Sequence, residues 1–179
     1  MAVAALLFLL LAVVMAFTGD GASWIVAATV VVAAIAGTLL PDLDTPLRLR
    51  HRSALLHSIL PLFVATLDPR TWPVAAGLGF GIGLHLAADL FPSRMRGFAT
   101  IKFPLWGSIG PILSYLWIAT NAVANLLGGL ILLGRVAQGQ PMLAAMATVG
   151  IMGTVYLIRT DGGWCALGLF GLIGWLAFR

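Results

Sequence analysis

The stretch GLGFGIGLHLAADLF, residues 77–91, places one histidine and one aspartate in an apolar run that also holds four glycines. His85 and Asp89 are four residues apart, so on a helix they share a face, one turn from each other. Gly77 and Gly81 continue the same stripe, and small residues let a neighbouring helix approach closely. No strand precedes the glycines, which argues against a dinucleotide-binding loop. The stretch therefore predicts a tightly packed helix that ends in two ionisable side chains.

The composition around this stretch is that of a membrane protein. The chain has 179 residues, of which 61% are hydrophobic and only 9% charged, whereas an ordinary globular domain is about a quarter charged. Its single cysteine, Cys165, excludes an internal disulfide and a cysteine-based zinc cluster. We expect one all-α, polytopic transmembrane helical bundle that occupies residues 1–179 as a single integral-membrane domain.

The apolar runs predict about six or seven membrane segments, because a helix needs roughly 20 apolar residues to cross a bilayer. Helices are the expected spanning form, since backbone groups in lipid must bond within their own segment. The first run is expected to be a retained helix and not a cleaved signal peptide. The third is short and the fifth long, so either can be re-entrant. The expected segments are 3–18, 22–40, 53–67, 72–91, 106–134, 140–158 and 162–178.

Basic residues orient the predicted bundle. Seven of the ten Lys and Arg residues fall in the loops at 41–52 and 92–105 or directly after residue 158. Positive charge favours the cytoplasmic side of a membrane protein, so we expect a bacterial-type inner membrane protein with a cytoplasmic N-terminus. Topology explains the net charge of +4 without a nucleic-acid partner, and no nucleic-acid motif is present.

The ionisable side chains gather in two patches at the predicted cytoplasmic face, within a core of about residues 35–105. The chain has no Glu, and all three His and three of the six Asp lie in these patches. An ionisable residue at membrane depth is costly and indicates a function. We therefore expect a shared metal site, with these candidate ligands: Asp42, Asp44, His51, His57, His85 and Asp89.

The type of ligand indicates the type of ion. Imidazole and carboxylate together suit Zn²⁺, Mn²⁺ or Fe²⁺ better than Ca²⁺, and zinc or manganese is the expected cofactor. Six candidates exceed the four ligands of a simple structural zinc site, so one ion with outer partners and two ions both stay open.

These motifs resemble those of the DUF457 family, which is described as membrane-bound metal-dependent hydrolases and includes the YdjM-like proteins. The matching pieces are LPDLD (40–44), HRSALLHS (51–58) and GLHLAAD (83–89). The resemblance covers about residues 35–105 and implies the six metal ligands named above. Leu56 stands where the family usually has Thr, and Leu84 where Ser often precedes the His, so two polar neighbours of the ligands are missing.

The leading functional hypothesis is metal-dependent hydrolysis at the cytoplasmic face, on a phospholipid or another lipid phosphoester. A bound ion activates water and polarises the attacked group, and Asp42 or Asp89 is the candidate general base. Guanidinium groups recognise phosphate well. The candidate substrate-binding residues are Arg52, Arg94, Arg96 and Lys102.

Two alternatives stay open. A non-catalytic metal-binding membrane subunit, alone, as an oligomer or in a larger complex, fits a small chain with short loops. A transporter coupled to ions or protons also uses intramembrane Asp and His, but such residues do not continue through the bilayer here, and no inverted repeat is present. Membrane lipids are the expected partners under every hypothesis.

Overall fold

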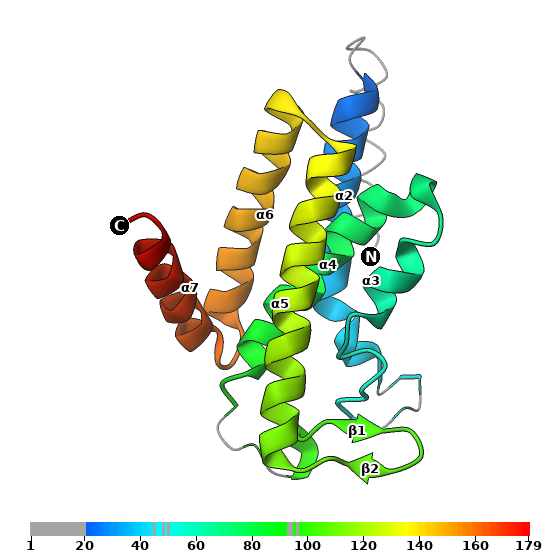
Figure 1. Ribbon diagram of the computed structural model, residues 1–179, viewed down its shortest axis with the longest axis vertical. Coiled ribbons are helices and arrows are strands. Elements are labelled where there is room, and N and C mark those ends of the chain that lie inside the picture. Colours follow the sequence, from blue (N-terminus) through cyan, green and yellow to red (C-terminus); the bar gives the residue numbers. More distant parts are fainter. Residues whose placement is uncertain (1–20, 45, 48, 50, 93–94, 96) are drawn as a thin grey trace.

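The computed structural model describes residues 21–44, 46, 47, 49, 51–92, 95 and 97–179, and these are mostly helical (Figure 1). A short two-stranded sheet joins the helices near one end of the bundle. In chain order the elements are α2 (Gly21–Leu39), η1 (Pro41–Asp44), α3 (Leu60–Ala65), η2 (Pro69–Thr71), α4 (Trp72–Asp89), η3 (Gly97–Ala99), β1 (Lys102–Phe103), β2 (Gly107–Ser108), α5 (Pro111–Val136), α6 (Gly139–Arg159) and α7 (Gly163–Ala177).

Helix α4 is the centre of the bundle and packs against α2 on one side and α5 on the other. The predicted glycine stripe explains how α2 comes so close. A Cβ added at Gly77 would collide with the backbone of Val30, and one added at Gly81 would collide with the carbonyl oxygen of Ala34. Glycine at both positions therefore permits direct backbone contact between the two helices, as the sequence predicted.

Three helical stretches of the described residues are long and apolar enough to cross a membrane: Pro69–Asp89, Pro111–Val136 and Gly139–Arg159. Two shorter apolar helices, Ser23–Leu39 and Gly163–Ala177, accompany them. The structure thus agrees with a helical membrane bundle, but it does not support six or seven spans. The expected segment 3–18 lies outside the described residues.

The expected third segment, 53–67, is not a span. It contains only the six-residue helix α3, and turns precede that helix. Non-helical backbone is tolerated at membrane depth only where protein groups satisfy it, and side chains of α5 do so here: the Ile59 amide donates to Asn121 Oδ1 over 2.8 Å. The short predicted length of this segment was the sign of a break.

The expected fifth segment, 106–134, starts too early. Strands β1 and β2 pair antiparallel, with Lys102 opposite Ser108, and α5 begins only at Pro111. Gly107 and Gly110 both adopt positive φ, 78° and 80°, a conformation that glycine tolerates and a continuous helix does not.

One end of the bundle collects the functional candidates. Helices α2, α4 and α6 all finish towards this end, which is the lower end in Figure 1, while α5 begins there. Residues that follow or finish these three helices, Asp42, Asp89 and Arg159, line a common cleft.

Candidate metal centre

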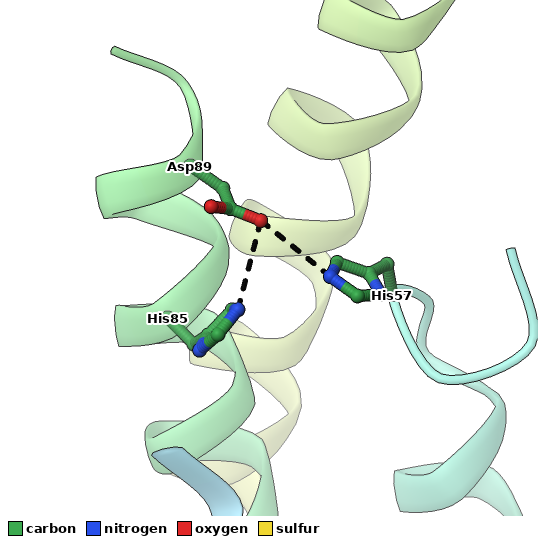
Figure 2. Close-up of side chains that lie close together, drawn as sticks. All are labelled: His57, His85 and Asp89. Atoms are coloured by element: carbon green, nitrogen blue, oxygen red, sulfur yellow. Dashed lines mark ion pairs between the residues drawn. The ribbon is translucent and has the colours of Figure 1, made fainter. Parts of the chain in front are cut away.

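His57, His85 and Asp89 form a buried cluster in which each residue offers one possible ligand atom, and all three atoms lie within 4.8 Å of one another. Figure 2 shows both imidazoles directed at one carboxylate. The Nε2 atom of His57 lies 3.5 Å from Asp89 Oδ2, and the Nε2 atom of His85 lies 3.6 Å from the same oxygen. His85 and Asp89 come from α4, as their spacing predicted, and His57 comes from the turns before α3.

These separations fit a shared cation. Zinc binds nitrogen and oxygen at 2.0–2.2 Å, so tetrahedral ligands lie about 3.4 Å apart. Among the described residues, no hydrogen-bond donor reaches the buried Oδ2 atom of Asp89. A buried carboxylate oxygen without a hydrogen bond is unfavourable. Arg52 bonds only the Oδ1 atom of this carboxylate, and a metal ion would satisfy Oδ2.

Contacts from α2 and α6 determine which ring nitrogen of His85 carries a proton and which can bind a ligand. Its Nδ1 atom lies 3.0 Å from the carbonyl oxygen of Thr38, which can only accept, so Nδ1 carries a proton and Nε2 is the nitrogen that can bind a ligand. The Tyr156 hydroxyl lies 3.1 Å from the same Nδ1 atom. Outer contacts of this kind orient metal-binding histidines. Neither partner had a signal in the sequence, because both lie far along the chain in apolar helices.

Arg52 holds the carboxylate in place. Its guanidinium donates to Asp89 Oδ1 over 2.6 Å and to the Ala99 carbonyl oxygen over 2.7 Å. The backbone amide of Lys102 donates to the Arg52 carbonyl, and Arg52 itself has a φ of 56°, rare for a residue with a side chain. The arginine predicted to bind substrate is therefore nearly buried against a candidate ligand; whether it also contacts substrate stays a prediction.

Side chains of α5 fix the segment that carries His57. Trp117 Nε1 donates to the His57 carbonyl oxygen over 2.8 Å, and Asn125 Nδ2 donates to that of Ser58 over 3.2 Å. With the bond from Ile59 to Asn121, three successive residues are thus tied to α5. The broken backbone is satisfied and His57 is directed towards α4.

Burial lowers the pKa of His57 to about 4; the neighbouring His85 and Arg52 lower it too, and Asp89 and Asp44 act in the opposite direction. At neutral pH the imidazole is therefore uncharged. Neutral imidazole is the form that binds metals, so no proton has to leave His57 when an ion binds near pH 7.

The remaining predicted ligands occupy two places. Asp42 is exposed on the rim of the cluster, with Oδ1 3.9 Å from His85 Nε2, and can complete a metal site. Asp44 is fully buried, where Oδ2 accepts from the Ser53 amide over 3.3 Å. His51 is partly exposed, with Nδ1 3.7 Å from Asp44 Oδ1. Within the described part of the chain, Asp44 and His51 do not join the three-residue cluster.

The other predicted substrate-binding cations are not gathered at the cluster. Lys102 Nζ donates to the carbonyl oxygens of His51 and Thr100, over 3.0 and 2.8 Å. Arg94 and Arg96 lie outside the described residues.

The cluster opens into a cleft of about 360 Å³, a size typical of small-molecule sites. Arg159 lines it and is exposed, and the sequence had indicated only a topological role for this residue. No described residue pairs with its guanidinium, so Arg159 offers an available positive charge. The cleft is lined by Thr38, Leu39, Asp42, Arg52, His85, Ala88, Asp89, Pro92, Tyr156, Arg159, Thr160 and Asp161.

No protein-family model matches the chain, and neither a curated protein nor a solved structure matches it. The resemblance to membrane-bound metal-dependent hydrolases therefore stays a prediction, and the chemistry of the site has to be argued from its geometry.

Proposed function

We propose that this protein is a membrane-embedded, metal-dependent hydrolase that cleaves a phosphoester at the cytoplasmic face. The observation that carries the proposal is the convergence of His57 Nε2 and His85 Nε2 on Asp89 Oδ2 at the edge of an open cleft. Convergent ionisable groups in a cleft are a general sign of an active site.

His57, His85 and Asp89 would hold the ion. A bound zinc or manganese ion supplies Lewis acidity and lowers the pKa of a coordinated water. Asp89 suits the role of ligand better than that of base, because Arg52 already occupies its Oδ1 atom. Asp42 is exposed in the cleft and is the better general base, positioned to accept the proton of the attacking water.

Arg159 would bind the anionic group of the substrate. Its guanidinium lies in the same cleft as Asp42, His85 and Asp89, and a guanidinium matches the geometry of a phosphoryl group. Binding there would hold the phosphorus beside the cluster, while Arg52 continues to position Asp89.

Metal content and turnover of matched histidine variants test the proposal. Purified protein is stripped with a chelator, reloaded with Zn²⁺ or Mn²⁺, and assayed on phosphatidic acid and on a soluble phosphodiester. We expect His57→Ala to lose the metal and the activity and His51→Ala to keep both, because only His57 belongs to the cluster. Equal metal content and equal turnover in the two variants would refute the assignment.

A non-catalytic metal-binding subunit is the second candidate, and one observation favours it. The cluster joins α4 to the segment before α3 and, through Arg52, to the backbone at Ala99, so a bound ion would also pin these parts together. This role would be indicated if the metal-loaded protein shows no turnover, loses thermal stability on chelation and co-purifies with other subunits.

A further inference from the structure

A second hollow lies between the apolar helices. It is an apolar groove of about 300 Å³ between α4, α5, α6 and α7; in Figure 1, α6 lies between α5 and α7. None of its lining side chains is charged. The groove is lined by Phe80, Leu84, Leu126, Met146, Val149, Gly150, Gly153, Thr154, Leu157, Leu167 and Phe170.

Two glycines of α6 shape this groove in different ways. A Cβ added at Gly153 would lie 2.8 Å from Leu84 Cδ1, so Gly153 lets α6 pack closely on α4. A Cβ added at Gly150 would meet no atom within 4 Å. The space beside Gly150, which lines the groove, is thus open to a Cβ, and we expect a leucine there to narrow the groove.

The groove has the length of one lipid leaflet. Along α6 it extends from Met146 to Leu157, which at 1.5 Å per residue is about 17 Å. Half of the hydrocarbon core of a bilayer is about 15 Å. One acyl chain of a lipid in the same leaflet as the metal cluster therefore matches the groove in length.

The end of the groove lies beside the metal cleft. Leu84 lines the groove and His85 the cleft; on α6, Leu157 lines the groove and Tyr156 the cleft. Successive residues of the same two helices thus face the two hollows. A lipid whose chain occupies the groove would have its head group at the end of α6 that carries Arg159.

We propose that the groove binds an acyl chain of the substrate, which makes the substrate an anionic lipid phosphoester whose head group reaches Arg159. This inference rests on the proposed function for the chemistry at the head group. The occupant follows from the lining: no wall side chain is charged, and the one hydroxyl, that of Thr154, already donates to the Gly150 carbonyl oxygen, so the groove favours an apolar chain over a polar group. A second copy of this chain is the competing occupant.

Native mass spectrometry of the full chain in detergent, titrated with dioleoyl phosphatidic acid, tests the groove without any need for turnover. We expect wild type to bind this lipid at least tenfold more tightly than dihexanoyl phosphatidic acid. Gly150→Leu should lose that preference. The matched control is Gly134→Leu, an equally open glycine of α5 that does not line the groove. If Gly150→Leu fails to fold, Met146→Trp fills the same groove from a side chain that is 41% exposed.

The outcomes separate the groove from the hydrolase. Unchanged binding of dioleoyl phosphatidic acid by both groove variants overturns the inference, as does a wild-type dimer that Gly150→Leu dissociates. The ratio of long-chain to short-chain lipid turnover is then compared between wild type and Gly150→Leu. An equal ratio in the two proteins also overturns the inference, but it leaves the proposed hydrolase activity in place. The expected binding pattern without turnover of either lipid refutes the proposed function and leaves the groove as a lipid site.

Discussion

Two aspartate–histidine groups at the same end of this protein differ in what they can bind. In the cluster of His57, His85 and Asp89, two buried imidazoles share one carboxylate oxygen. In the pair of Asp44 and His51, a single imidazole whose side chain is 44% exposed faces a fully buried carboxylate. The sequence predicted both groups as parts of one metal site. Only the first brings three ligand atoms together among the described residues.

The difference comes from how far apart the partners lie in the chain. Asp44 bonds locally: its carboxylate accepts from Ser53, and its carbonyl oxygen accepts from Leu49. Local bonds between an Asp side chain and the backbone stabilise turns, so Asp44 shapes the loop. Asp89 instead meets His57 and Arg52, residues from another segment. A carboxylate that organises its own loop has fewer oxygens left for an ion.

The sharpest test of this comparison replaces each carboxylate in turn. Asp89→Asn should reduce metal content at least tenfold and destabilise the fold by about 3–5 kcal/mol, because it leaves the buried Arg52 guanidinium without its counter-charge. Asp44→Asn should keep the metal. Metal analysis and thermal unfolding measure both effects, and metal lost equally from the two variants would contradict the distinction.

Acid should affect the metal-free cluster next. The pKa of His57 is about 4 in the folded protein and 6.5 as the ordinary value, so the unfolded chain binds the proton first as pH falls. Protonation of His57 therefore leaves the free energy of unfolding unchanged above pH 6.5 and lowers it as the pH falls from 6.5 to 4. The loss amounts to roughly 3 kcal/mol. Thermal unfolding across this range should show a smaller slope in His57→Gln; an identical slope would contradict the burial effect.

A smaller effect is expected from Arg52→Lys. One ammonium group cannot reproduce the fork of bonds to Asp89 and Ala99, so the carboxylate would lose its fixed orientation. Changes to such outer partners typically cost 10–100-fold in metal affinity, and we expect about tenfold in a zinc titration. Arg159→Lys is the control, since it should weaken substrate binding and leave zinc affinity unchanged. Equal zinc affinities in wild type and Arg52→Lys would remove Arg52 from the site.

The smallest effect is expected from Trp117→Phe, which removes one hydrogen bond to the His57 carbonyl. Such a bond contributes about 1 kcal/mol, so the unfolding temperature should fall by a few degrees, and zinc affinity should fall only a few-fold. The matched control is Trp106→Phe at the exposed end of the β-hairpin, which should change neither quantity. Equal changes in both variants would show that α5 does not position His57.

The parts of this protein that the sequence predicted are those that follow from local spacing. His85 and Asp89 share a face of α4 because four residues make about one helical turn, and Gly77 and Gly81 allow α2 to approach for the same reason. The apolar runs predicted helices, and three helical stretches of the described residues are long and apolar enough to span a membrane. The run containing His57 looked like the start of a membrane helix, because hydropathy does not register that α5 satisfies its backbone.

The sequence by itself determined that the chain is apolar and helical, and that all three His and three of the six Asp fall in two patches. Only the tertiary structure decided which of six candidates meet. It also supplied Thr38 and Tyr156 behind His85 and set Arg52 against Asp89. The physical reason is range. Helical periodicity acts over one turn, whereas contacts 37 to 71 residues apart depend on which helices pack together, and a local pattern such as the glycine stripe does not identify the partner helix.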